Sequence, residues 1–72
     1  MKGKKEVEGT EYYPNGQIEY EGGFYKGERN GEGKQYELDG KIKYKGKYFF
    51  GSWDGKGEEY KDGNLIFKGI YR

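Results

Sequence analysis

Few side chains in this sequence are suited to acid–base, nucleophilic or metal chemistry. The chain contains no His and no Cys, which removes the usual general base, the thiol nucleophile and the commonest zinc ligands. Ser52 and Thr10 are the only aliphatic hydroxyls, and the sequence places no base beside either of them. The 13 carboxylates are scattered along the chain, so no spacing indicates a paired general acid and base.

Two short motifs resemble ligand-binding loops, and both are incomplete. Gly33-Lys34 is similar to the end of a phosphate-binding loop, but Glu28 stands where that loop needs glycine and Gln35 where it needs Ser or Thr. Asp39-Gly40 lacks the further oxygen ligands of a calcium loop. The sequence therefore predicts a protein that is not an enzyme and that uses no cofactor or metal.

The composition favours a small domain made of strands. A chain of 72 residues is long enough for one domain with a thin core. Charged residues make up 38% and the mean hydropathy is −1.36, which is typical of disorder, but nine Tyr, four Phe and one Trp provide the apolar area of a folded core. The 15 glycines and the absence of alanine disfavour helices, whereas Tyr, Phe and Ile favour strands.

The sequence indicates a cytoplasmic location. Without cysteine the chain forms no disulfide and is compatible with a reducing compartment. Its first residues lack the hydrophobic segment of a signal peptide, and no apolar run reaches the roughly 18 residues of a membrane span. The net charge of +1 provides no overall attraction to nucleic acids or membranes.

Aromatic residues and glycines recur along the chain with a period of 24 residues: Tyr20 is followed by Tyr44, and Gly33 by Gly57. Such a period marks an array in which each unit packs on the next one. We predict an N-terminal arm with a frayed end and then a repeat domain. The arm is residues 1–8, the domain is residues 9–72, and the three units are about 3–26, 27–50 and 51–72.

Each unit is predicted to be a β-hairpin, because Asn-Gly or Asp-Gly pairs between alternating segments are the strongest short-range signal for a tight turn. The turns are Asn15-Gly16, Asp39-Gly40 and Asp62-Gly63. The strands that flank them are 9–14 and 17–25, 33–38 and 41–49, and 57–61 and 64–72. Residues 26–33 and 50–57 are expected to connect the hairpins. The predicted fold is all-β, a single twisted antiparallel meander of three stacked hairpins.

The second strand of each hairpin is expected to have an aromatic inner side and a polar outer side. In residues 41–48, Lys alternates with Ile42, Tyr44, Gly46 and Tyr48. The glycines at 22, 46 and 69 are expected to leave room for a ring or to mark a bend. The residues assigned to the inner face are Tyr12, Tyr20, Phe24, Tyr36, Tyr44, Tyr48, Tyr60, Phe67 and Tyr71.

The segments YEGGFYKGERNGEGKQY (20–36) and YKGKYFFGSWDGKGEEY (44–60) resemble the MORN repeat. The pattern of that family is roughly Tyr-x-Gly-x-aromatic-x-x-Gly-x-x-x-Gly-x-Gly-x-x-Tyr, and the resemblance covers most of residues 9–71. It implies a single elongated sheet of stacked hairpins without enzyme activity. It also implies a role in scaffolding, in protein–protein contacts or, as in some members, in binding anionic phospholipids.

The first candidate binding site is aromatic. Phe50 and Trp53 stand where the preceding unit has Lys26 and Arg29, and with Phe49 they would form an exposed patch of the kind that binds partners. The alternative is that Trp53 folds back over the thin core. A tyrosine-rich face is also suited to binding protein. The residues predicted to bind a partner are Phe49, Phe50, Trp53, Tyr20, Tyr44 and Tyr48.

The second candidate site is a row of lysines in one predicted strand. If these side chains share one face, the row suits phosphate groups of a lipid or a nucleic acid. The matching strand of the first unit carries Glu19 and Glu21, so a mixed-charge, solvent-exposed face is the alternative. The lysines are Lys41, Lys43, Lys45 and Lys47.

These features together predict a small non-enzymatic interaction module that binds another protein. Its size suggests an inhibitor, such as a phage-type protein that blocks a bacterial defence enzyme. One alternative is a peripheral module that binds anionic phospholipids or phosphoinositides through the lysines. Another is a single-strand nucleic-acid binder whose tyrosines stack on bases, although the charge of the chain makes nucleic acid a poor partner. Open sheet edges would also permit a homodimer.

Overall fold

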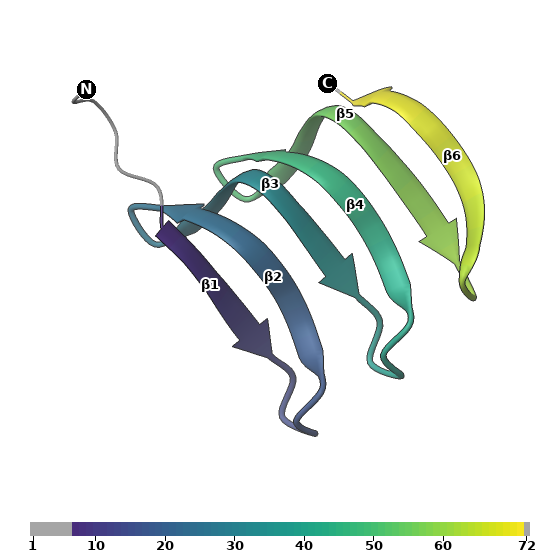
Figure 1. Cartoon of the computed structure of the whole chain (residues 1–72), viewed down its shortest axis with the longest axis horizontal. Helices are drawn as coiled ribbons and strands as arrows, with labels where there is room; N and C mark the ends of the chain where they lie inside the picture. The colour runs from purple at the N-terminus through teal and green to yellow at the C-terminus, as the bar shows by residue number, and fades with distance from the viewer. Residues whose placement is uncertain (1–6, 72) are drawn as a thin grey trace.

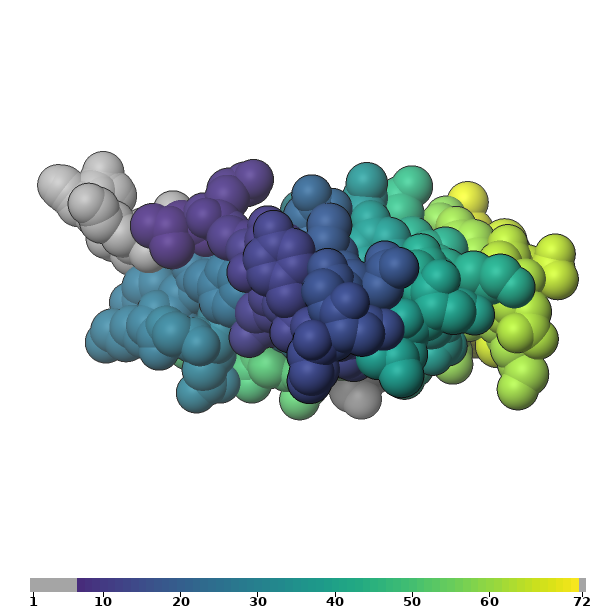
Figure 2. Space-filling model, turned by 90° about the horizontal axis from the view of Figure 1, so that it is seen from below, coloured from purple at the N-terminus to yellow at the C-terminus, as the bar shows by residue number. Residues whose placement is uncertain are grey.

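The computed structural model describes residues 7–71, which form one open sheet of six antiparallel strands (Figure 1). Every strand lies beside its neighbours in the sequence, which confirms the predicted all-β meander. The strands are β1 (Val7–Tyr12), β2 (Ile18–Tyr25), β3 (Glu28–Tyr36), β4 (Ile42–Phe49), β5 (Ser52–Lys61) and β6 (Asn64–Tyr71). The molecule measures 40 × 30 × 14 Å, so it is one layer thick, as the view along the sheet shows (Figure 2).

The sheet begins earlier than the sequence indicated. Val7 and Glu8 are paired in β1 instead of belonging to the predicted arm, and the rest of that arm lies outside the described residues. Within residues 7–71 there is no helix that could span a membrane.

The connections between hairpins are much shorter than predicted. The chain reverses in two residues at Lys26-Gly27 and at Phe50-Gly51, so most of residues 26–33 and 50–57 belongs to β3 and β5. Both residues of each turn have positive φ, with values of 53° at Lys26 and 45° at Phe50. This conformation is that of the tight hairpin turn that normally has Asn or Asp before Gly. The unusual first residues hid these two turns from sequence reasoning.

The predicted turns at the opposite end of the sheet lie where the sequence placed them, but only Asp62-Gly63 is a two-residue turn with positive φ, whereas the first two are longer connections, 13–17 and 37–41. The chain closes one turn with a hydrogen bond from Tyr13 N–H to the carbonyl of Gln17 at 2.8 Å, and the turn around Asp39-Gly40 closes in the same way. The Tyr13 hydroxyl also donates to the carbonyl of Tyr36 at 2.7 Å. Successive hairpins are therefore joined at their turns as well as along their strands.

One glycine from every strand forms a continuous row across the sheet. The six residues are in direct register: Gly9, Gly22, Gly33, Gly46, Gly57 and Gly69. Bulges follow Gly22 and Gly46, as the prediction of a bend required. Gly69 leaves room for the ring of Phe67, as predicted, and Gly33 and Gly57 do the same for Tyr20 and Tyr44, whose rings a Cβ atom at either position would overlap.

The core is a row of aromatic rings that pack on these glycines. Tyr20 and Tyr44 are fully buried and Tyr48 is 3% exposed. The ring of Tyr48 meets the other two edge to face, at centroid distances of 5.0 and 5.3 Å. The hydroxyls of Tyr20 and Tyr44 donate to the carbonyls of Gly23 and Lys47 at 2.8 Å. Contacts between rings and hydrogen bonds from the hydroxyls together hold these tyrosines in place.

Three tyrosines assigned to the inner face lie on the opposite face. Gln35 accepts hydrogen bonds from core side chains, so its neighbour Tyr36 points the other way and donates to Glu21 Oε1 at 3.4 Å. Tyr60 donates to Glu58 Oε1 at 2.7 Å, and Tyr12 is exposed. The prediction failed here because it grouped these residues by their aromatic character, whereas alternation along β3 and β5 places Tyr36 and Tyr60, three residues after the core-facing Gly33 and Gly57, on the other face.

Candidate functional site

The structure divides the predicted aromatic site into a buried part and an exposed part. Trp53 stacks on Tyr44 with a centroid distance of 4.3 Å and an interplanar angle of 5°. Its indole N–H donates to Gln35 Oε1 at 3.1 Å, which is the arrangement that the alternative interpretation described. Tyr20, Tyr44 and Tyr48 are also part of the core. The three tyrosines therefore offer almost no surface to a partner in this conformation, and Trp53, which is partly buried, packs against them.

The change from Arg29 in the first unit to Trp53 in the second is accompanied by a second change at a contacting position. In the first unit, Arg29 lies over the Tyr20 ring at 4.6 Å and its Nε donates to Glu11 Oε1 at 2.8 Å. Trp53 lies 24 residues after Arg29, and Gln35 lies 24 residues after Glu11. In the second unit, Trp53 therefore replaces Arg29 and Gln35 replaces Glu11. A charged donor with a charged acceptor has become a neutral donor with a neutral acceptor. This paired change explains Trp53 as a packing residue.

We expect this pairing to be measurable as a coupling free energy. Arg29→Trp alone leaves Glu11 without its guanidinium, and Glu11→Gln alone leaves Arg29 with Glu19 Oε2 at 3.4 Å. The variant Arg29→Trp/Glu11→Gln copies the pair of the second unit. Urea denaturation of the four proteins should show a double variant that is about 1 kcal/mol more stable than the sum of the single effects predicts. Strictly additive effects would contradict the pairing.

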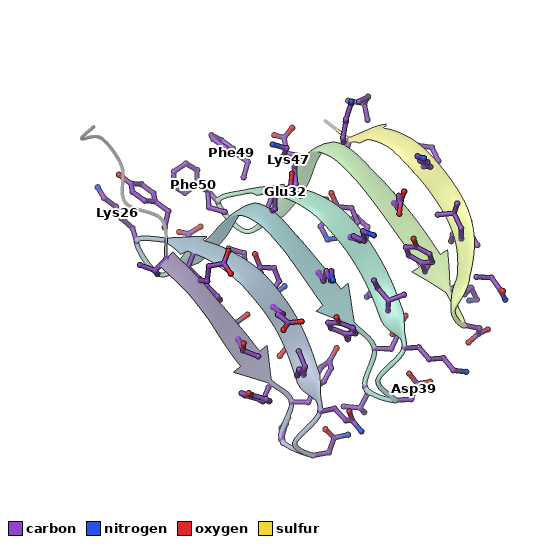
Figure 3. The ribbon with its side chains drawn as sticks, viewed as in Figure 1. Lys26, Glu32, Asp39, Lys47, Phe49 and Phe50 are labelled. Carbon is purple, nitrogen blue, oxygen red and sulfur yellow. The ribbon has the colours of Figure 1, made fainter. Side chains whose placement is uncertain are left out.

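The exposed part of the aromatic site is the Phe49-Phe50 patch, which consists of these two side chains and the neighbouring ring of Tyr25. Phe49 and Phe50 are 58% and 45% exposed, and their ring centroids are 4.7 Å apart. Tyr25 meets Phe50 edge to face at 6.1 Å. Figure 3 shows the two phenylalanines at the same end of the sheet as Lys26 and at the other end from Asp39.

The backbone of Phe50 is held in a conformation that phenylalanine disfavours. Its φ of 45° lies in the left-handed region, which costs an ordinary residue about 1–2 kcal/mol. Hydrogen bonds to β3 hold the turn in this conformation. Phe50 N–H donates to the buried Asn30 Oδ1 at 3.0 Å, and Gly51 N–H donates to the Arg29 carbonyl at 2.9 Å. Strain of this kind persists where the surrounding structure imposes it, and it is frequent at functional sites.

The predicted row of lysines is not a continuous ridge. The pairing of β4 with β3 skips Lys43, and Lys41 precedes β4, where its N–H donates to Asp39 Oδ1 at 3.0 Å. Lys45 and Lys47 flank Gly46 instead. Lys45 and Lys47 thus share one face as predicted, whereas Lys41 lies outside the strand and Lys43 stands at a bulge, which interrupts the even spacing of the four lysines.

A shallow groove of about 540 Å³ runs along the glycine row on the face opposite the core. Its charges are mixed. Lys47 lies 3.5 Å from Glu32 (Figure 3), and Lys68 lies 3.7 Å from Glu58. The hydrogen bond from Tyr60, together with the neighbouring lysines, holds the pKa of Glu58 below its usual value. The other charged side chains that line the groove are Lys45 and Lys56.

Sequence reasoning missed two residues of β6 that depart from the repeat. Ile66 and Ile70 occupy the positions that Lys43 and Lys47 hold in β4, and both isoleucines are exposed. Aligning the third unit with the second position by position would have found them. They form an apolar surface on the last strand that the packing of the core does not require.

Comparison with known proteins found no family model, no curated protein and no solved structure that matches the chain. Among residues 7–71, no group of three or more acidic, His or Cys side chains is placed to hold a metal ion. The features that distinguish this chain are therefore surfaces: the Phe49-Phe50 patch, the groove and the edge of β6.

Proposed function

We propose that this chain is a small non-enzymatic module that binds another protein through the Phe49-Phe50 patch. The observation that carries the proposal is the pair of exposed phenyl rings on a turn whose backbone disfavours phenylalanine. Apolar rings gathered on an exposed surface are typical of partner sites, and aromatic residues dominate binding energy at many interfaces.

The equivalent turn of the first unit supports the proposal. That turn has Lys26 where this one has Phe50, and the two turns have similar backbone conformations. The fold thus accepts a charged, solvated residue at this position. Exchanging such a residue for phenylalanine adds exposed apolar area and contributes little to the core, so a gain in binding is the physical reason that we assign to it.

The shape of the described sheet supports a role in which it covers a surface of its partner. A single-layer sheet has no enclosed cavity for catalysis, and its tandem hairpins resemble MORN repeats, which are associated with protein–protein contacts. We therefore extend the proposal to an inhibitor that acts by occupying its target.

Affinity capture from a lysate of the source cell tests this proposal, with three baits compared by quantitative mass spectrometry. The baits are the wild type, Phe49→Ser/Phe50→Asn, and Lys26→Asn as a matched control at the equivalent turn. A protein retained by the wild type and by Lys26→Asn, and lost from the double variant, is the expected result. Equal recovery on all three baits would assign binding to another surface and contradict the proposal.

Binding of anionic phospholipid is the second candidate, and the groove is the observation that favours it. Lys45, Lys47, Lys56 and Lys68 line the groove, but two of these lysines already pair with Glu32 and Glu58. The two carboxylates therefore offset part of the positive charge of the groove, and Lys45 and Lys56 are the lysines of its lining for which no ion pair is seen among the described residues. This function predicts cosedimentation with anionic vesicles that falls steeply with salt, and cosedimentation that is absent or insensitive to salt would exclude it.

A further inference from the structure

The outer edge of β6 differs from the other edge of the sheet. β6 pairs with β5 alone among the described strands, and Lys68 is its only charged residue. β1, at the opposite edge, carries Glu8 and Glu11, and charges of this kind normally prevent edge strands from pairing with other chains. The exposed apolar side chains of β6 are Leu65, Ile66, Phe67 and Ile70.

Two strand pairs within the sheet show what kind of strand binds to an edge like that of β6. β2, β4 and β6 are equivalent strands of successive units, and β2 and β4 receive β3 and β5 as antiparallel neighbours. In each pair, the tyrosine of the receiving strand covers a glycine of the incoming strand, Gly33 or Gly57. These glycines are paired with Gly22 and Gly46 of the receiving strands.

The incoming strand also supplies a side chain that covers the receiving tyrosine. Arg29 lies over Tyr20 at 4.6 Å, and Trp53 stacks on Tyr44 at 4.3 Å. In both strands this residue precedes the covered glycine by four positions. The two internal interfaces therefore define one incoming sequence: Arg or Trp, three residues, and then Gly.

On β6 the receiving half of this interface is present, and no described strand supplies the incoming half. Phe67 occupies the position of Tyr20 and Tyr44, but it is 46% exposed whereas both tyrosines are fully buried. Gly69 continues the glycine row beside it. The ring of Phe67 contacts Tyr71 at 5.3 Å, so it is already oriented on the core side of the sheet.

We propose that the free edge of β6 binds an extended segment of a partner protein as a seventh, antiparallel strand. The segment has a glycine opposite Gly69, under the ring of Phe67, and an Arg or Trp four residues earlier that covers that ring. Adding a strand to an exposed sheet edge is an established mode of peptide recognition, in which main-chain hydrogen bonds give affinity and side chains give specificity. Ile66 and Ile70 enlarge the apolar contact where β4 has lysines.

The segment Ser52–Lys61 of this chain is the probe, because β5 already fills the equivalent place on β4. A fluorescein-labelled synthetic peptide of this sequence should give saturable anisotropy with the full chain, and its Gly57→Val version should bind at least tenfold more weakly. In ¹⁵N-labelled protein, the peptide should shift the amide signals of residues 64–71 and leave those of β1 unchanged.

A matched protein variant tests the surface. Ile66→Lys/Ile70→Lys restores the residue type that β4 carries at the same positions, so the fold should persist while peptide binding falls at least fivefold. The Phe49→Ser/Phe50→Asn variant should bind the peptide as the wild type does, which separates this inference from the proposed function.

Three results would overturn the inference. One is the absence of saturation at 1 mM peptide, and another is equal binding of the Gly57→Val peptide. The third is sedimentation of the free chain as a dimer whose amides in residues 64–71 resist hydrogen exchange, because a second copy would then occupy the edge.

Discussion

Replacing Gly57 with valine is expected to prevent the chain from folding. A Cβ atom at this position would lie 2.6 Å from Cε1 and 2.7 Å from Cζ of Tyr44, which is closer than carbon atoms can approach. The ring cannot move aside, because it is fully buried, stacks on Trp53 and donates its hydroxyl to the Lys47 carbonyl. Displacing a buried ring costs about 3–5 kcal/mol. A domain of 72 residues has only about 4–11 kcal/mol of stability in total.

Circular dichroism and urea denaturation would check this expectation. Lys56→Val is the matched control, since it makes the same change of side chain at the exposed neighbour in the same strand and should leave the fold intact. Gly33→Val, under the ring of Tyr20, should behave like Gly57→Val because the two positions are equivalent. A folded Gly57→Val protein with the urea midpoint of the wild type would mean that the ring does not rest on the glycine row.

The register of the sheet shows how far sequence reasoning reaches. The 24-residue period and the Asn-Gly and Asp-Gly pairs were sufficient to predict the meander and the three hairpins. They did not reveal the row of six glycines, because its register depends on the two-residue turns at Lys26-Gly27 and Phe50-Gly51. Neither Lys nor Phe is a normal first residue for such a turn, so the segments on either side were interpreted as connections.

The two faces of the sheet could be assigned only in part. Alternation placed Tyr20, Tyr44 and Tyr48 correctly in the core, but Tyr36 and Tyr60 were assigned to it with the other aromatic residues. Alternation within their own strands places them on the other face, because Gly33 and Gly57, three residues before them, lie under core rings. The sequence alone did not show which glycines lie under rings, so the inner face of β3 and β5 was not fixed.

For the candidate site, the informative signals were residues that differ between equivalent positions of the repeat. They had to be read together with the residues that they contact. Trp53 in place of Arg29 suggested an exposed patch, whereas the accompanying Gln35 in place of Glu11 indicates a buried pair. Among the described aromatic residues, the ring of Phe50 meets only Phe49 and Tyr25; it lies outside the core cluster and is exposed. A departure that is matched elsewhere is explained by packing, and an unmatched one is the better indication of function.

Because Phe50 differs from Lys26 without a matching change, one substitution at Phe50 should affect stability and binding in different ways. Phe50→Asn places a residue that tolerates left-handed backbone at a position with a φ of 45°. It removes a strain of about 1–2 kcal/mol and loses two edge contacts, with Phe49 and Tyr25, that are worth about 0.5 kcal/mol each at this exposed site. The free energy of unfolding should therefore stay the same or rise by up to about 1 kcal/mol.

Affinity for the captured partner should fall in the same variant. Truncating an aromatic side chain at the centre of an interface typically costs 2 kcal/mol or more, which corresponds to a loss of about 30-fold. Urea denaturation and calorimetric titration of one protein sample would measure both quantities. Lys26→Asn relieves the same strain in the equivalent turn and should leave affinity unchanged. If Phe50→Asn instead destabilised the chain and bound its partner normally, Phe50 would be a packing residue, and the strained turn would serve the fold alone.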